Sequence, residues 1–229
     1  MITGASRGFG RELVDVYATA GWVVFPLVRR QADGDDLLSV HGSPCHPIIG
    51  DVGQDSVAEA ISRTLEKHSS SLDVLINNAG NIKKNRGILP AASDDMIDHF
   101  NVHCVGALRC TKAALPYLQN ASRPVVVNIS SRWGSISRTV SGQGGLIYAY
   151  QIAKCAQNML SACLSQELRP ENIRVFTVQP GRLKTSVAAA DADIDPKDAA
   201  QRLFEWIDRV DDHPQFAFYD LMTGITIDW

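Results

Sequence analysis

Apolar residues recur along this chain in two alternating patterns. Short continuous apolar runs predict buried strands at residues 22–28, 46–50, 72–76, 125–129, 173–178 and 216–219. Apolar residues at helical spacing predict amphipathic helices over residues 9–21, 57–65, 93–118, 148–168 and 196–207. Strands that alternate with helices are typical of a parallel sheet with helices on both faces. The pattern therefore predicts a Rossmann-like, doubly wound α/β fold.

No linker, internal repeat or low-complexity segment divides the chain, so residues 1–229 are predicted to form a single domain. The first strand is unusual, because only Met1 and Ile2 precede Thr3. In such a fold the first strand is normally central and longer. Either this strand is very short or the natural chain begins upstream, and both interpretations stay open.

Composition and charge narrow the classes of partner. Hydrophobic residues make up 45% of the chain and charged residues 21%, the net charge is −3, and the pI is about 6.0. There is no basic block and no long apolar run, so neither nucleic acid nor a membrane is an expected partner. Five cysteines without a C-x-x-C motif, and no signal-peptide pattern, indicate free thiols in a cytoplasmic protein. No metal is expected, because no cluster of ligand residues stands out.

A glycine motif, Gly4, Gly8 and Gly10, follows the first strand and opens a helix. Glycines at such a turn let the backbone approach a pyrophosphate, and the helix N-terminus offers free N–H groups. The alternative is an ordinary glycine-rich turn, which can have the same glycine spacing without binding a ligand. The position between a strand and a helix favours nucleotide binding.

Two arginines, Arg29 and Arg30, end the second predicted strand. An acidic residue there would hydrogen-bond the adenosine ribose, whereas arginine accommodates a 2′-phosphate. Arg7 in the glycine motif adds another cation nearby. These residues favour NADP(H) over NAD(H), which stays possible. The alternative is that the arginines only solvate a loop, above all Arg30.

Tyr150 and Lys154 lie four residues apart on the predicted helix 148–168, and this spacing places them on one helix face. A free phenol has a pKa near 10, and a nearby cation lowers that pKa and suits the phenol to proton transfer. Such pairs are also common on ordinary helices. Ser131, directly after the strand 125–129, and the nucleotide-binding motifs make the pair a candidate catalytic set.

Six motifs occur in order along nearly the whole chain: Thr3-Gly4-x-x-x-Gly8-x-Gly10, Asp51-Val52, Asn77-Asn78-Ala79-Gly80, Asn128-Ile-Ser-Ser131, Tyr150-x-x-x-Lys154 and Pro180-Gly181-x-x-x-Thr185. Together they resemble the classical short-chain dehydrogenase/reductase family. Residues 131–137 and 148–150 look most similar to its C-factor and sniffer-type carbonyl reductases. The resemblance implies an oxidoreductase that uses NADP(H) to interconvert a small carbonyl compound and its secondary alcohol.

The resemblance also implies roles for individual residues. Tyr150 would donate the proton in reduction, Lys154 would lower its pKa and bind the nicotinamide ribose, and Ser131 would hydrogen-bond the substrate oxygen. The residues implied to line the dinucleotide are Gly4, Ser6, Arg7, Phe9 and Gly10 at the pyrophosphate and adenosine end, Asp51 and Val52 at the adenine, Asn78, Ala79 and Gly80 at the adenosine ribose, and Pro180, Gly181, Leu183 and Thr185 towards the nicotinamide. Family members commonly pair through two long helices, which implies a homodimer or homotetramer.

One departure from the family lies on the predicted long helix. His103 stands three residues before Gly106, where the family usually has an asparagine that supports a water chain from the lysine. Histidine could replace that asparagine, because one ring nitrogen can donate while the other accepts. It could equally be a plain core residue, and we favour the working replacement. Asn101 is two residues away and is expected to point to another face.

The second departure is a long segment in front of the candidate site. Ser131 and Tyr150 are 19 residues apart, which places extra residues in a glycine-rich loop at 137–146. Trp133 and Tyr148 flank the site and either contact substrate or pack, whereas Trp206 is expected in the core. Residues 187–194 follow the last motif, where the family carries a mobile lid, and we expect them to close over substrate.

A hypothesis from a different class remains. The chain could be an NADP(H)-binding regulatory or signalling protein with little turnover. His103 in place of the usual asparagine motivates it.

Overall fold

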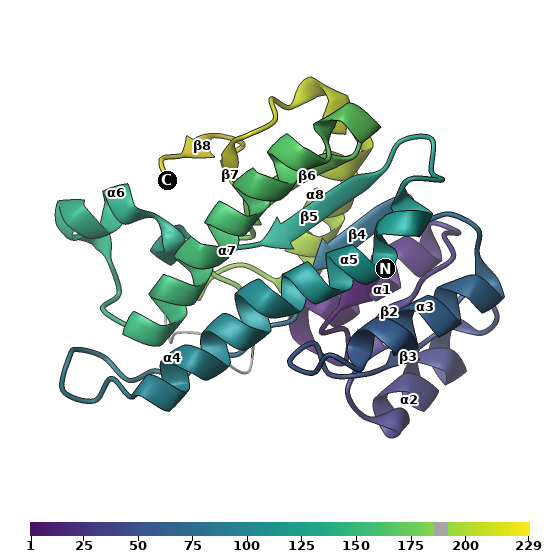
Figure 1. Ribbon diagram of the computed structural model, residues 1–229, viewed down its shortest axis with the longest axis horizontal. Coiled ribbons are helices and arrows are strands. Elements are labelled where there is room, and N and C mark those ends of the chain that lie inside the picture. The colour runs from purple at the N-terminus through teal and green to yellow at the C-terminus, as the bar shows by residue number, and fades with distance from the viewer. Residues whose placement is uncertain (186–191) are drawn as a thin grey trace.

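The computed structural model describes residues 1–185 and 192–229, and in these residues one sheet runs through the molecule between two layers of helices (Figure 1). The strand order is β3-β2-β1-β4-β5-β6-β7-β8. All neighbouring strands are parallel except β8, which pairs antiparallel with β7. The strands are β1 (Ile2–Thr3), β2 (Pro26–Val28), β3 (Ile48–Ile49), β4 (Val74–Asn77), β5 (Val125–Ile129), β6 (Arg174–Gln179), β7 (Phe218–Asp220) and β8 (Thr226–Ile227).

Helices cover both faces of the sheet, as the alternation of strands and helices predicts. The α-helices are α1 (Gly8–Thr19), α2 (Gln31–His41), α3 (Val57–His68), α4 (Ser93–Phe100), α5 (Gly106–Leu118), α6 (Ile136–Arg138), α7 (Tyr148–Glu167) and α8 (Pro196–Asp208). The shorter helical turns are η1 (Asn101–Val105), η2 (Arg132–Gly134), η3 (Thr139–Gln143), η4 (Arg169–Glu171) and η5 (Val210–Asp212). The predicted fold class is confirmed.

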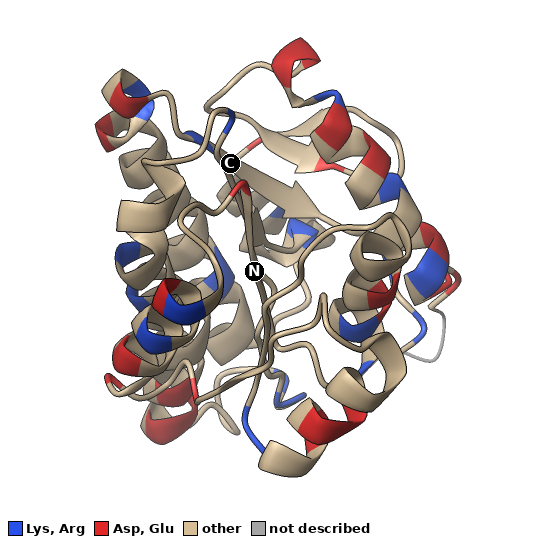
Figure 2. Cartoon of the chain, turned by 90° about the vertical axis from the view of Figure 1, so that its right-hand side faces the viewer, with Lys and Arg blue, Asp and Glu red and all other residues tan. Residues whose placement is uncertain are grey.

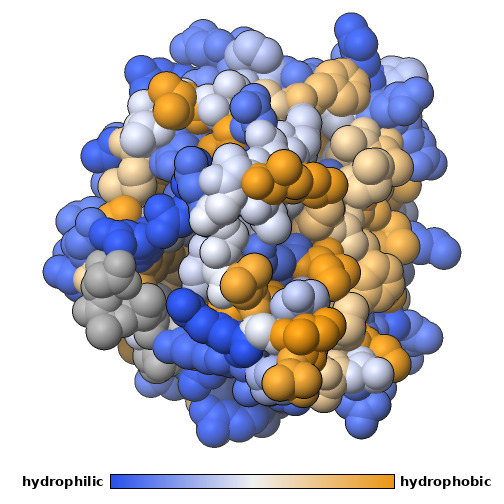
Figure 3. Space-filling view, turned by 90° about the vertical axis from the view of Figure 1, so that its left-hand side faces the viewer, coloured by the Kyte–Doolittle hydropathy of each residue, from blue (hydrophilic) through white to orange (hydrophobic). Residues whose placement is uncertain are grey.

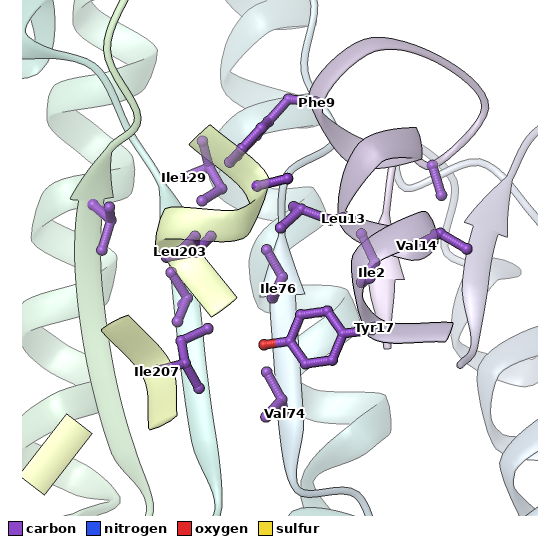
Figure 4. Close-up of a cluster of buried hydrophobic side chains, with 14 of the residues drawn as sticks. Ile2, Phe9, Leu13, Val14, Tyr17, Val74, Ile76, Ile129, Leu203 and Ile207 are labelled. Atoms are coloured by element: carbon purple, nitrogen blue, oxygen red, sulfur yellow. The ribbon is translucent and has the colours of Figure 1, made fainter. Parts of the chain in front are cut away.

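Two hydrophobic clusters hold these layers together. On one face, α1 and α8 bury Leu13, Tyr17 and Leu203 against Ile76 of β4 (Figure 4). The other face is covered by α3, α5 and α7, with Ile61 as one of the fully buried side chains. Full burial of a leucine or isoleucine side chain contributes about 2 kcal/mol relative to exposure. Because β4 and β5 are buried on both faces, their residues form continuous apolar runs, and this is why both strands were predictable.

The predicted strand 22–28 is too long. Only Pro26–Val28 pairs as a strand, while Val24 makes a single bridge to Cys45, and Trp22 and Val23 are exposed. Pro26 has no N–H to donate to a ladder, which explains the weak pairing before it. Helix α2 was not predicted, because it buries little besides Leu37 and therefore shows almost no apolar periodicity.

Local irregularities also separate the structure from the prediction. The helix predicted over 93–118 is continuous but contains a π-turn, η1, in its middle. The loop expected at 137–146 is partly helical, because the hydroxyl of Ser135 caps α6 by accepting the N–H of Arg138. The side chain of Asp195 caps α8 by accepting the N–H of Lys197, whereas Ser56 precedes α3 without a side-chain capping bond.

The carboxyl ends of the parallel strands meet at one edge of the sheet, and every motif singled out above follows one of these ends or begins a helix beside them. On the side shown in Figure 2, acidic and basic residues are interspersed along the outer helices. None of the described helices is long and apolar enough to span a bilayer. Most of the expected lid, residues 187–194, lies outside the described residues.

Candidate active site

The glycine motif forms a tight turn between β1 and α1. Gly4 and Gly8 have φ of 67° and 56°, in the left-handed region that favours glycine. A Cβ on Gly10 would lie 2.3 Å from the carbonyl oxygen of Gly4, so no side chain fits there. Arg7 stands at the N-cap of α1 without a side-chain capping bond, and the first turn holds no acidic residue. The N–H groups at this helix end are therefore available to an anion.

Thr3 fastens this turn to the end of β4. Its hydroxyl accepts the backbone N–H groups of Asn78 at 3.0 Å and Ala79 at 2.9 Å. The side-chain amide of Asn78 donates back to the carbonyl of Thr3 at 2.9 Å. A Cβ on Gly4 would lie 2.7 Å from Cα of Ala79, so the two strand ends are in close contact. The motif 77–80 is thus placed beside the glycine turn.

Phe9 does not line a ligand site with its side chain. The ring is buried in the hydrophobic cluster under α1 and α8 (Figure 4). The side chain therefore makes no contact with a dinucleotide at this turn, and the expectation that Phe9 lines the dinucleotide stays a prediction for its backbone. Only its backbone N–H stays at the helix end.

Three arginines surround the start of α2. Arg30 donates to both carboxylate oxygens of Asp33, at 2.9 and 2.5 Å. These bonds hold the pKa of Asp33 below its usual value, and the charges of Arg29 and Arg7 add to the effect. Neither Arg7 nor Arg29 has a hydrogen bond or an ion pair with any described residue. The alternative weighed for Arg30, a local surface contact, is what the structure shows, and Arg7 and Arg29 remain open for an anion.

Other predicted dinucleotide residues border the same edge. Asp51 accepts the backbone N–H of Gly53 at 2.9 Å, and the buried Val52 packs against Gly106. Beyond β6, Gly181 follows Pro180 with φ of 100°, and Leu183 pairs with Ile194 in a single bridge. The methyl group of Thr185 lies 3.3 Å from the position of a Cβ on Gly8. The segment after β6 therefore reaches the glycine turn.

Tyr150 and Ser131 meet at the start of α7. The Ser131 hydroxyl lies near the Tyr150 hydroxyl and accepts the N–H of Trp133 at 3.2 Å. Burial raises the pKa of Tyr150, and the interaction with Ser131 opposes that rise. The ring of Trp133 stands edge-on to Tyr150, with 6.2 Å between centroids. Strand β5 and helix α7 thus bring together a phenol and a hydroxyl that are distant in sequence.

Lys154 lies directly behind this pair. Its side chain is buried, and its Nζ lies 5.8 Å from the centroid of the Tyr150 ring. Nζ donates to the carbonyl of Ile129 at 2.6 Å and to Oε1 of Gln157 at 2.9 Å. Burial lowers the pKa of Lys154 to about 7. The lowering of the tyrosine pKa expected from Lys154 is not seen in this arrangement, because burial destabilises both charged forms.

His103 closes the site from the long helix. It lies in the π-turn η1, and such turns often occur at functional sites. Its ring stands edge-on to Tyr150, with 5.4 Å between centroids, and Nε2 lies 2.8 Å from the carbonyl of Asn81. Burial lowers the pKa of His103 well below its usual range, and the charge of Lys154 adds to this, so the imidazole is neutral.

The other ring nitrogen of His103, Nδ1, is buried without a hydrogen-bond partner among the described residues. Asn101 points elsewhere, as expected: its amide donates to the carbonyl of Gly53 and its oxygen accepts from Arg109. His103 is therefore the side chain that the long helix presents to Tyr150.

The comparison with known proteins decides the class. The family model described as "short chain dehydrogenase" matches residues 1–195. The C-signal protein of Myxococcus xanthus is 32% identical over 162 residues, which cover 69% of this chain and 93% of that protein.

The chain belongs to the short-chain dehydrogenase family.

Two solved structures of carbonyl reductases agree. The NADPH-bound carbonyl reductase from chicken fatty liver superposes with a TM-score of 0.89 at 26% identity, over 100% of this chain and 97% of that one. Carbonyl reductase Sniffer of D. melanogaster gives 0.88 at 26% identity, over 100% and 98%. The predicted family, its C-factor and sniffer-type subgroup and the oxidoreductase class are confirmed.

Two loops of this short-chain dehydrogenase meet beside Tyr150. The N–H of Gly87 donates to the carbonyl of Leu146 at 2.9 Å, which joins the loop after β4 to the segment before α7. Leu146 has a backbone φ of 53°, which is rare for residues other than glycine. Ile88, Leu89 and Val140 on these segments are exposed, and Figure 3 shows apolar groups gathered on this side of the molecule. The rim formed by these two loops therefore exposes apolar side chains next to the charged stretch Lys83 to Arg86.

Sequence reasoning missed Gln157 and the role of Thr3. Gln157 lies three residues after Lys154, so the spacing alone places both on one helix face. A polar residue at that position of a helix packed on a sheet was the available signal. Trp206 packs in the core, as expected.

Proposed function

We propose that this protein is an NADP(H)-dependent oxidoreductase that transfers hydride between the nicotinamide and a carbonyl or secondary alcohol substrate, with Tyr150 as the acid and base. The observation that carries the proposal is the Tyr150 hydroxyl next to Ser131, with the buried Lys154 amine 5.8 Å from the centroid of the tyrosine ring. The carbonyl reductases with the same fold support it.

The residues at the strand ends fit a dinucleotide. Gly4 and Gly10 let β1, α1 and β4 pack closely, because a Cβ at either position would collide with a neighbour, and the N-terminus of α1 is open to a pyrophosphate. Arg7 and Arg29 suit a 2′-phosphate, and the nearby Asp33 is already paired with Arg30. We therefore favour NADP(H), with NAD(H) as the alternative. When bound, the nicotinamide supplies hydride in reduction and accepts it in oxidation.

Each member of the set then has a task. Ser131 donates a hydrogen bond to the substrate oxygen and stabilises the negative charge that grows on it. Tyr150 gives this oxygen its proton, a step worth about 10²–10⁴ in rate. Lys154 in its charged form favours the phenolate that results. An ammonium has three N–H donors, and two are engaged, so one stays available to a ribose hydroxyl.

We infer that His103 replaces the usual asparagine of the family. The shorter of its two contacts with Asn81 assigns the proton to Nε2, which donates to the carbonyl, and this leaves Nδ1 as an acceptor in the buried site. A neutral imidazole beside Lys154 adds no opposing charge. His103 is thus a candidate for proton transfer, because Nδ1 can accept a proton on the side of Lys154 while Nε2 donates to the carbonyl of Asn81 in the loop after β4.

The test is an assay of NADPH oxidation against a panel of aldehydes, ketones and quinones. Turnover that disappears in Tyr150→Phe supports the proposal, and turnover that is undiminished in that variant contradicts it. The alternative function, a regulatory NADP(H)-binding protein, predicts tight NADPH binding in a fluorescence titration and no turnover with any member of the panel.

We further propose that residues 1–229 act as one dinucleotide-binding domain in the cytoplasm and assemble as a homodimer or homotetramer. Large apolar side chains are exposed on the long helix, at Phe100 and Leu108, and on α7, at Ile152 and Met159. These are the helices through which the family commonly pairs. Sedimentation equilibrium of the wild type and of Met159→Glu tests the assembly, and a monomeric wild type contradicts it.

A further inference from the structure

Gln157 has no task in the function proposed above, although it contacts the amine of Lys154. It lies on the face of α7 that packs on the sheet, and its side chain is 1% exposed. Burying an amide costs free energy unless the amide is hydrogen-bonded, and an apolar side chain would fill such a position at a lower cost. Its presence here is therefore linked to the group that it contacts.

The surroundings of Lys154 explain that link. Nζ is held by two neutral oxygens from two elements, the carbonyl of Ile129 on β5 and Oε1 of Gln157 on the next turn of α7. Within the described residues no carboxylate pairs with Lys154. A buried ammonium without a counter-ion depends on such hydrogen bonds, because they stabilise the charged form.

Gln157 also lies beside His103. Both residues border one narrow crevice, together with Thr3, Ala79 and Gly106, and this crevice leaves no room for a water molecule. Gln157 is therefore packed between the crevice and Lys154, and its oxygen contacts the amine directly. The amide of Gln157 comes from α7, and the imidazole of His103 comes from η1 in the long helix.

We propose that Gln157 is a positioning residue of the active site, whose amide oxygen holds the Lys154 amine behind Tyr150 and favours its protonated form. The proposal rests on the function proposed above. The titratable groups that face Lys154 are Tyr150 on its own helix and His103 on η1, with His99 of α4 stacked behind His103 at 5.9 Å between centroids. Strand β5 contributes a neutral carbonyl.

The direct test is a carbon-13 NMR titration of the Lys154 side chain in the intact protein, with its signal assigned by Lys154→Arg. Gln157→Met keeps the length of the side chain and removes the acceptor. We expect the pKa of Lys154 to fall by about one unit, the effect of losing one hydrogen bond to a charged group. The matched control is Gln151→Met, a buried glutamine of α7 that bonds Ile147 and Thr139 and not Lys154.

The control variant Gln151→Met should leave the pKa of Lys154 unchanged. If Gln157→Met also leaves this pKa unchanged, the proposal is overturned. Gln157→Glu provides a second variant in case Gln157→Met folds poorly, because a carboxylate at this position should raise the pKa of Lys154 above that of the wild type. A titration that does not move in Gln157→Glu overturns the proposal as well.

Kinetics add a readout that a purely structural role would not move. The limb of the kcat/KM profile that follows the loss of the Lys154 proton should shift to lower pH by about one unit in Gln157→Met, together with the NMR titration. The outcomes are separable. A shifted Lys154 titration in a protein without turnover contradicts the proposed function alone, and an unshifted titration in an active enzyme contradicts the role of Gln157 alone.

Discussion

The imidazole of His103 occupies the space that a side chain on Gly80 would need. A Cβ at Gly80 would lie 2.5 Å from Cε1 of His103 and 3.0 Å from its Nδ1. The glycine that ends the motif after β4 and the unusual histidine of the long helix are therefore matched to each other.

This match predicts a coupled pair of variants. Gly80→Ala should lower the free energy of unfolding by about 1–3 kcal/mol, because the methyl group overpacks against the buried ring. In a His103→Asn background the same change should cost less, because asparagine is smaller, with a coupling of about 1 kcal/mol. Urea denaturation of the four proteins gives the cycle. Additive effects would show that Gly80 and His103 do not restrict each other.

Burial of Lys154 predicts a pH-dependent stability. Its folded pKa of about 7 lies below the ordinary value near 10.5, so between these values the unfolded chain binds more protons than the folded one. The free energy of unfolding should therefore rise with pH across this window, by about 3–5 kcal/mol from this group. Urea denaturation from pH 6.5 to 10 should show that rise in the wild type relative to Lys154→Met. Parallel curves for the two proteins would mean that burial does not lower the pKa of Lys154 in the folded protein.

Much of the fold could be predicted because its elements carry strong local patterns. Strand β5 was expected over its observed residues, and α7 within one residue of its end, since both are long runs of regular burial. Helix α2 carries little such signal and was missed.

The site was predictable in outline and not in detail. The roles proposed for Tyr150, Lys154 and Ser131 follow from motifs, whereas the way in which Thr3 fastens the glycine turn to the end of β4 depends on contacts that spacing does not reveal. The contact between Gln157 and Lys154 and the pairing of Arg30 with Asp33 are local, and both became meaningful only once their surroundings were known.

Arg29 is predicted to select the phosphorylated dinucleotide. Arg29→Ala should raise the Kd for NADPH about tenfold and change that for NADH little, because one charge-assisted contact to the 2′-phosphate is lost. Arg63→Ala is the matched control, since Arg63 is an exposed arginine on α3 at the opposite face of the sheet. The measurement is a fluorescence titration with both nucleotides. An equal loss of affinity for NADPH and NADH would show that Arg29 does not recognise the 2′-phosphate.

Leu146 is predicted to hold a strained backbone for a functional reason. Its φ of 53° is unfavourable for leucine by about 1 kcal/mol, so Leu146→Gly should keep or raise the melting temperature. Val140→Gly, in the neighbouring turn η3 with ordinary helical backbone, should instead destabilise by about 1 kcal/mol. With active substrates, Leu146→Gly should raise KM for bulky apolar carbonyl compounds. A large loss of stability in Leu146→Gly would show that the side chain, and not the backbone, is what the position requires.

The most direct test of the central claim combines binding and turnover in Tyr150→Phe. The phenyl ring keeps the packing against His103 and Trp133, so NADPH should bind within about threefold of the wild-type affinity. Without the hydroxyl, carbonyl reduction should fall by about 10²-fold or more. Retained binding with lost turnover is the predicted result, and a variant that reduces carbonyl substrates at the wild-type rate would contradict the account.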